Sequence, residues 1–106
     1  MAYFLTSHGY EVSAALDGNR AVELGATGDY ALAILDVHMP TYDGIEVLQM
    51  LRRRHVLHPL KIIALTGDST TVTRDALEDA GVDEVMTKPV DLKTLVAHVK
   101  ELIGPA

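Results

Sequence analysis

The chain has 106 residues, no cysteine, and a net charge of −6 from 9 Lys and Arg against 15 Asp and Glu. The missing cysteines exclude disulfide scaffolds, thiolate metal sites and cysteine nucleophiles, and the negative charge argues against a nucleic-acid partner. No apolar run approaches the roughly 20 residues of a membrane span, and no leader resembles a signal peptide. We therefore expect one domain covering residues 1–106 that is cytoplasmic and has no membrane partner.

The first third of the chain contains a short helical pattern, a strand pattern and a second helix. Residues 2–8 are expected to form the tail of a helix that closes at Gly9. Residues 10–14 follow as a weak strand candidate, and Gly18–Ala26 as a short helix.

The rest of the chain alternates apolar runs with helical patterns. Residues 30–35 and 60–65 are apolar at successive positions, which is typical of strands buried on both faces of a parallel sheet, and Glu84–Thr87 is a weaker strand candidate. Three helices are expected between and after these runs. The first carries Ile45, Leu48 and Leu51 and begins after the cap Asp43, and the second covers residues 70–80 and ends at Gly81. The third is Leu92–Ile103, with Asp91 as its N-cap and an apolar stripe at positions 92, 95, 96, 99, 102 and 103.

This alternation predicts an α/β domain with three layers, a doubly wound parallel sheet covered by helices on both faces. The beginning of the chain is unusual for that fold, because such a domain normally opens with a strand. Only eight residues precede Gly9, which is too few for a strand, a loop and a helix together.

Three chemically active side chains follow three successive predicted strands. Asp36 follows the predicted strand at residues 30–35, Thr66 follows the one at 60–65, and Lys88 follows the one at Glu84–Thr87. Functional groups of parallel α/β sheets gather beyond the carboxyl ends of the strands, so neighbouring strands would bring these groups together. A carboxylate beside an ammonium and a hydroxyl suits phosphoryl transfer to Asp36, giving an acyl phosphate. Spacing alone leaves open a simpler interpretation, an Asp–Lys ion pair with Thr66 as a helix cap.

The motifs around these residues resemble the receiver domain of two-component response regulators, including the chemotaxis regulators. They are Asp36-Val-His-Met-Pro40 with Asp43-Gly44, Leu65-Thr-Gly67, and Met86-Thr-Lys-Pro89, supported by Gly-Tyr-Glu-Val at 9–12 and Ala80-Gly-Val-Asp83. The resemblance covers essentially the whole chain. It implies the flavodoxin-like fold, with sheet order 2-1-3-4-5.

The resemblance also assigns roles to residues. Asp36 would be the phospho-acceptor, Thr66 the switch hydroxyl and Lys88 the phosphate-pairing lysine, with a cis peptide bond between Lys88 and Pro89. The family's Mg²⁺ site would take Asp36 and the backbone carbonyl of His38. The expected partners are a histidine kinase or phosphotransfer protein and a downstream protein.

Two departures from the family pattern affect these roles. The acidic pair that follows the family's first strand has no counterpart, so Mg²⁺ affinity and self-phosphorylation should fall. Three residues before the lysine, where the family often has Tyr or Phe, this chain has Val85, so the usual inward turn of an aromatic ring cannot operate.

The absent first strand would lie inside the sheet, where its loss leaves unpaired backbone groups. We expect one of three explanations: truncation of an ordinary receiver, which ranks first, rebuilding of residues 1–7 as a strand, or a homodimer in which two chains close the sheet. Such a dimer would also be the structural consequence of truncation.

Three functions compete. The first is a phospho-accepting signalling domain, which is not an enzyme beyond self-phosphorylation and self-dephosphorylation. The second is a pseudo-receiver that acts only through protein–protein interaction or dimerisation. The third, a phosphohydrolase with an Asp nucleophile, is disfavoured because such enzymes need a second Asp close behind the first, and Asp36-Val-His supplies none.

Overall fold

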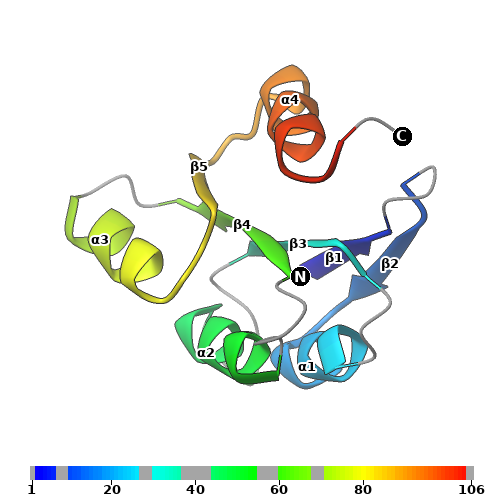
Figure 1. The fold of residues 1–106 in the computed structure, drawn as a ribbon. Helices are drawn as coiled ribbons and strands as arrows, with labels where there is room; N and C mark the ends of the chain where they lie inside the picture. The colour runs from blue at the N-terminus through cyan, green and yellow to red at the C-terminus, as the bar shows by residue number, and fades with distance from the viewer. Residues whose placement is uncertain are drawn as a thin grey trace.

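The computed structural model of the chain describes residues 2–6, 10–26, 30–36, 44–54, 60–67 and 71–104. The described elements, in chain order, are β1 (Ala2–Leu5), β2 (Val12–Ala15), α1 (Gly18–Ala26), β3 (Leu32–Asp36), α2 (Gly44–Arg54), β4 (Lys61–Thr66), α3 (Thr71–Asp79), β5 (Glu84–Thr87) and α4 (Leu92–Ile103). They form the predicted α/β architecture, with helices on both faces of one five-stranded sheet (Figure 1). None of the helices in this part of the chain has the length and hydropathy that a membrane span requires.

The strands lie in the order β2-β1-β3-β4-β5. β3, β4 and β5 are parallel, as the apolar runs predicted. β1 is antiparallel to both of its neighbours, with Phe4 opposite Ser13 on one side and Ala33 on the other. The sheet is therefore mostly parallel, with one reversed strand in its interior.

The prediction of a helix over residues 2–8 is wrong for residues 2–5, which form β1. The physical reason is the interior position between β2 and β3, where an empty slot would leave two rows of backbone donors and acceptors unpaired. The chain fills this slot with its own first residues, which was the second of the three explanations above. Because the sheet is complete within one chain, no second chain is needed to close it. Gly9, the expected end of that helix, lies outside the described residues.

Two apolar clusters cover the two faces of the sheet. On one face, Phe4 and Ala33 pack with side chains from α1, α2 and α3, among them Leu24, Leu48 and Leu77. On the other face, Leu5, Leu32 and Ile34 pack with Val99 and partly buried residues of α4. Among the described helices, three therefore cover one face and α4 covers the other.

Arg52, near the C-terminal end of α2, joins three elements. Its Nε and Nη2 atoms donate to the carbonyl of Gly81, its Nη1 donates to the carbonyl of Leu60 at 2.5 Å, and its Nη2 lies 3.0 Å from Oδ2 of Asp83. The same Asp83 oxygen accepts a hydrogen bond from the backbone N–H of Ile62 at 2.7 Å. Arg52 thus ties the end of α2 to the beginning of β4 and to the turn between α3 and β5.

Replacing Arg52 by methionine is expected to lower the free energy of unfolding by about 2 kcal/mol, because charged hydrogen bonds to half-buried carbonyls are lost. Urea unfolding followed by circular dichroism measures this loss. Arg53→Met on the same turn is the matched control, since Arg53 is exposed, and it should change stability by less than about 0.5 kcal/mol. Equal losses in the two variants would contradict this role of Arg52.

Candidate functional site

Three parallel strands end at one edge of the sheet, and each of them brings a polar side chain there. Asp36 is the last residue of β3, Thr66 is the last residue of β4, and Lys88 directly follows β5. The register pairs Asp36 with Leu65, and Thr66 with Thr87. The backbone alone therefore places the three residues on neighbouring strands at nearly the same level.

Asp36 and Lys88 form an ion pair across β4. The Lys88 Nζ atom lies 2.7 Å from Oδ2 of Asp36, although 52 residues separate them in sequence. The Lys88 side chain is 38% exposed and the Asp36 side chain is 25% exposed. A pair this open to water contributes little to stability, about 0–1 kcal/mol, yet it leaves the carboxylate accessible to a reactant.

Thr66 ends the strand that runs between this carboxylate and this ammonium. It is 1% exposed and is the buried polar residue of the described core. Its carbonyl accepts a hydrogen bond from the backbone N–H of Lys88 at 2.8 Å, which fixes the segment after β5 against β4. The peptide bond between Lys88 and Pro89 is cis, as the resemblance implied.

In the described part of the chain, no group of three or more His, Asp or Glu side chains is arranged to hold a metal ion. The antiparallel direction of β1 adds to this, because the carboxyl end of β1 lies at the edge of the sheet opposite Asp36. Residues that follow β1 are thereby carried away from Asp36, whereas a parallel first strand would deliver them beside it. Mg²⁺ favours an oxygen shell anchored by carboxylates, and Asp36 is the one carboxylate that the described strand ends bring to this edge.

The remaining predicted site features fall into two groups. His38, whose carbonyl the resemblance offered to the metal, and Asp43, the expected helix cap, lie outside the described residues. Val85 is buried in the apolar cluster beneath α3, so the structure has an aliphatic side chain at the position where the family often has an aromatic ring.

The apolar stripe of α4 is only partly buried. Leu92 and Val96 belong to this stripe, yet they are 72% and 45% exposed. The sequence signal of this exposure is the width of the stripe. With about 100° between successive residues, the six apolar positions cover roughly 120° of the helix, which is wide for one contact with a sheet.

Three comparisons with known proteins agree with this geometry. The family model of the response regulator receiver domain matches residues 1–100. The transcriptional regulatory protein TcrA of Mycobacterium tuberculosis is 38% identical over 102 residues, covering 96% of this chain and 40% of the relative. The response regulator RR06 of Streptococcus pneumoniae is 36% identical over 103 residues, covering 97% and 46%. The chain thus spans less than half the length of these relatives.

Solved structures of receiver domains resemble this fold closely. The receiver domain of the sensor histidine kinase PA1611 from Pseudomonas aeruginosa, which holds magnesium in its active-site cleft, superposes with a TM-score of 0.80 at 27% identity, covering 92% of this chain and 80% of that one. The chemotaxis protein CheY4 of Vibrio cholerae gives 0.80 at 26%, covering 89% and 78%. The receiver domain of Ssk1 from Saccharomyces cerevisiae, solved with the histidine phosphotransfer protein Ypd1, gives 0.76 at 25%, covering 82% and 67%.

The matched family model spans nearly the entire chain, and the strand ends carry an aspartate, a threonine and a lysine in the family's order. This chain belongs to the response regulator receiver domain family, the signalling domain of two-component systems.

Proposed function

We propose that this chain is a single receiver domain that accepts a phosphoryl group on Asp36 and thereby changes its affinity for a protein partner. The single observation that carries the proposal is the Asp36–Lys88 pair at 2.7 Å. The donor would be a phosphohistidine on a histidine kinase or a phosphotransfer protein, as in the complex of Ssk1 with Ypd1. We infer a cytoplasmic location, where such donors act.

The proposed reaction needs little from the protein beyond position and charge. An oxygen of the Asp36 carboxylate attacks phosphorus, the bond from phosphorus to the imidazole nitrogen of the donor breaks, and the departing histidine takes up a proton. Lys88 first holds the carboxylate in place and then neutralises the phosphoryl oxygens. Thr66 would donate its hydroxyl proton to one of these oxygens.

Magnesium would contribute less here than in a receiver with an acidic pair beside the acceptor. The support for this is the described donor set, in which Asp36 lacks an acidic cluster around it. Beyond accepting and losing its own phosphoryl group, the chain would not act as an enzyme.

Incubation with acetyl phosphate, read by intact-protein mass spectrometry, tests the proposal. The expected result is a gain of one phosphoryl group in the wild-type chain and none in Asp36→Asn. A parallel incubation with EDTA in place of magnesium measures the metal's contribution, which we expect to be small. A gain that persists in Asp36→Asn would contradict the assignment of the acceptor.

The second candidate function is a pseudo-receiver that works by binding alone. The observation that favours it is the donor set around Asp36, since in the described part of the chain no group of three or more His, Asp or Glu side chains is arranged to hold a metal ion. No gain of mass in the wild-type chain, with or without magnesium, would support this candidate over the first.

A further inference from the structure

The reversed direction of β1 brings its amino end to the edge of the sheet that carries Asp36. Ala2, the first described residue, is opposite Leu35, and Leu5 is opposite Leu32. Opposed residues of antiparallel strands have Cα atoms about 4.5–5.5 Å apart, and Asp36 directly follows Leu35. Figure 1 shows the end of the chain marked N at this end of β1. Polypeptide that joins Ala2 therefore enters the sheet beside the proposed phospho-acceptor.

Exposed leucines flank Asp36 at this edge. The strand order places β1 between β2 and β3, and β2 ends at the same edge as β3 because each of them is antiparallel to β1. Leu16 directly follows β2 and is 69% exposed. Leu92 begins α4 close behind Lys88, on the β5 side of the site, and is exposed as well. The edge thus offers apolar contacts to a protein on both sides of Asp36.

A protein phosphodonor covers the amino end of β1 when it reaches Asp36. A typical protein contact covers about 800 Å² of each partner, which corresponds to a disc of roughly 16 Å radius. β1 lies one strand spacing from β3, about 4.8 Å, and the ends of β2 and β5 lie two spacings away, about 10 Å. A disc centred on Asp36 therefore reaches the ends of all five strands. Acetyl phosphate, by contrast, needs only the exposed part of the carboxylate.

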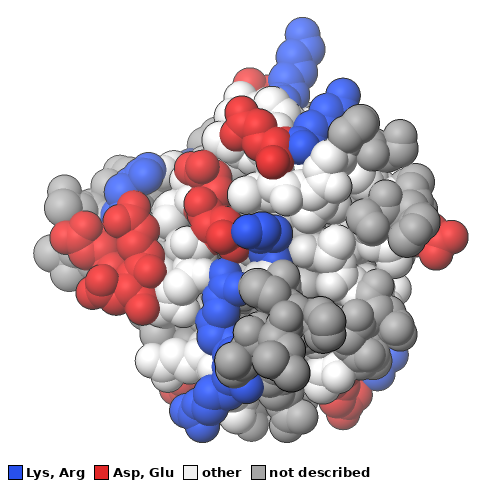
Figure 2. Space-filling view, viewed as in Figure 1, with Lys and Arg blue, Asp and Glu red and all other residues white. Residues whose placement is uncertain are grey.

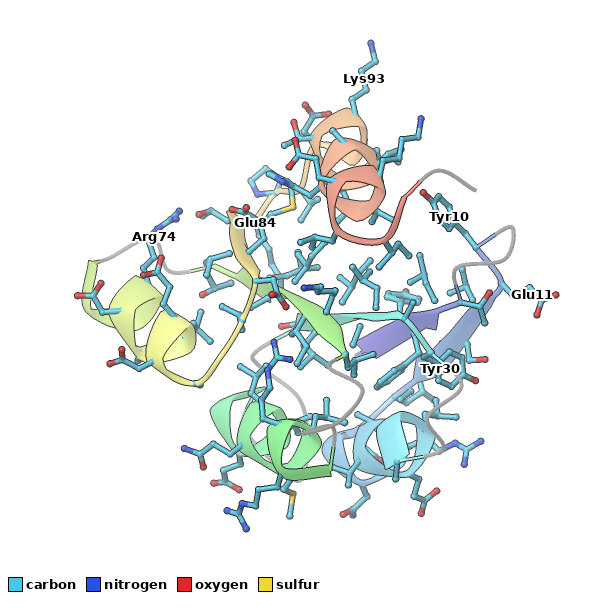
Figure 3. The ribbon with its side chains drawn as sticks, in the orientation of Figure 1. Tyr10, Glu11, Tyr30, Arg74, Glu84 and Lys93 are labelled. Carbon is cyan, nitrogen blue, oxygen red and sulfur yellow. The ribbon has the colours of Figure 1, made fainter. Side chains whose placement is uncertain are left out.

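The helix α4 ends at the opposite edge of the sheet. Tyr10 precedes β2, whose first residue, Val12, is opposite Leu5 at the far end of β1. The Tyr10 hydroxyl donates a hydrogen bond to the carbonyl of Gly104, which directly follows α4. Figure 3 shows Tyr10 reaching the chain at the end of α4. Polypeptide attached behind α4 therefore starts away from Asp36.

We propose that the polypeptide ahead of β1 regulates Asp36 by size: a folded domain joined directly to Ala2 excludes protein phosphodonors, whereas small phosphodonors still reach the carboxylate. This rests on the proposed role of Asp36 as the phospho-acceptor. A folded neighbour is then compatible with transfer from a protein only when it is joined behind α4. A parallel first strand would reverse the rule for its amino end, because that end would lie at the edge opposite Asp36.

Thiol reactivity at position 36 tests the proposal, and the absence of native cysteine leaves a single thiol to follow. Asp36→Cys is prepared as the unfused chain, with a small cysteine-free folded domain joined directly ahead of Ala2, and with the same domain joined behind Ala106. Each form reacts with N-ethylmaleimide and with a maleimide carried on a small folded protein. Intact-protein mass spectrometry measures both rates.

The domain ahead of Ala2 is expected to slow the protein-bound maleimide about tenfold or more, because few directions of approach remain. N-ethylmaleimide should react within about twofold of its rate with the unfused chain. The domain behind Ala106 is the control and should slow neither reagent. Equal slowing of the protein-bound maleimide by the two fusions, or no slowing by the domain ahead of Ala2, would overturn the proposal. Slowing of both reagents alike by that domain would refute the size limit.

The fused domain carries no net charge, so that bulk alone distinguishes the fusions from the unfused chain. Exposed acidic side chains gather over α3, where Figure 2 shows them, at Asp75, Glu78 and Asp79, and a charged domain would change how fast reagents arrive. Circular dichroism checks that each form is folded. If the domain ahead of Ala2 prevents folding, an uncharged Gly/Ser extension of about 20 residues, which spans roughly 25 Å, replaces it at both ends, with an expected slowing of about threefold.

The thiol reaction does not require phosphorylation, so this proposal and the proposed function can fail separately. If the wild-type chain takes no phosphoryl group from acetyl phosphate, the proposed function is wrong whatever the thiol rates are. If it is phosphorylated on Asp36 and the two fusions give equal thiol rates, Asp36 is the acceptor but the amino end of β1 does not limit access to it.

Discussion

Replacing Phe4 by alanine is expected to destabilise the domain by about 3–5 kcal/mol, the usual loss for a buried aromatic ring in a core. Phe4 belongs to β1 and is 0% exposed. Its side chain packs on the face of the sheet that α1 covers, with its ring 5.5 Å from the ring of Tyr30. Domains of this kind unfold with only about 5–15 kcal/mol, so the substitution removes a large share of the total. Urea unfolding followed by circular dichroism measures it.

Tyr3→Ala is the matched control for Phe4→Ala, because Tyr3 is adjacent in sequence but lies on the other face of β1 and is 39% exposed. We expect it to cost about 1 kcal/mol or less. If Phe4→Ala does not fold, Phe4→Leu keeps the test measurable, at about 1–2 kcal/mol. Equal losses at positions 3 and 4 would contradict the alternation of a strand at residues 2–5.

Replacing Lys88 by methionine is expected to slow phosphoryl transfer to Asp36 about 100-fold, since the cation that neutralises the phosphoryl oxygens is lost. The stability of the fold should change by no more than about 1 kcal/mol, because the Asp36–Lys88 pair is partly exposed. The rate of mass gain with acetyl phosphate and the urea midpoint, measured on the same sample, separate the two effects.

Lys61→Met is the matched control for Lys88→Met. It removes the same charge from the first residue of β4, at the edge of the sheet opposite Asp36. We expect the rate of phosphorylation to be unchanged in this variant. A similar slowing in both would mean that net charge, rather than the position of Lys88, governs the reaction.

The position of Asp36, Thr66 and Lys88 at one edge of the sheet could be predicted from sequence because each of them ends or directly follows a predicted strand. The apolar runs before Asp36 and Thr66 are continuous enough to indicate strands buried on both faces, and parallel neighbours must end at the same edge. The 2.7 Å contact between Asp36 and Lys88 follows from that arrangement. The boundaries moved by one or two residues: the strand expected at residues 10–14 is Val12–Ala15, and the one expected at 60–65 is Lys61–Thr66.

The contacts of Arg52 could not be predicted from sequence. Arg52 donates hydrogen bonds to the carbonyls of Gly81 and Leu60. Those acceptors belong to distant segments of the chain, and no local pattern shows that they meet. Exposure of Leu92 and Val96 could not be predicted for the same reason, since burial of an apolar stripe depends on how much sheet lies beneath it.

The amino-acid sequence by itself determined the layered α/β class, the order of its elements, and the position of Asp36, Thr66 and Lys88 at successive strand ends. These features depend on periodicity within short segments, which neighbouring residues set. Only the tertiary structure decided that Ala2–Leu5 is a strand and that it runs antiparallel between β2 and β3. Four residues have too little local preference to choose between helix and strand, and pairing with two neighbouring strands satisfies backbone groups that would otherwise be buried without partners.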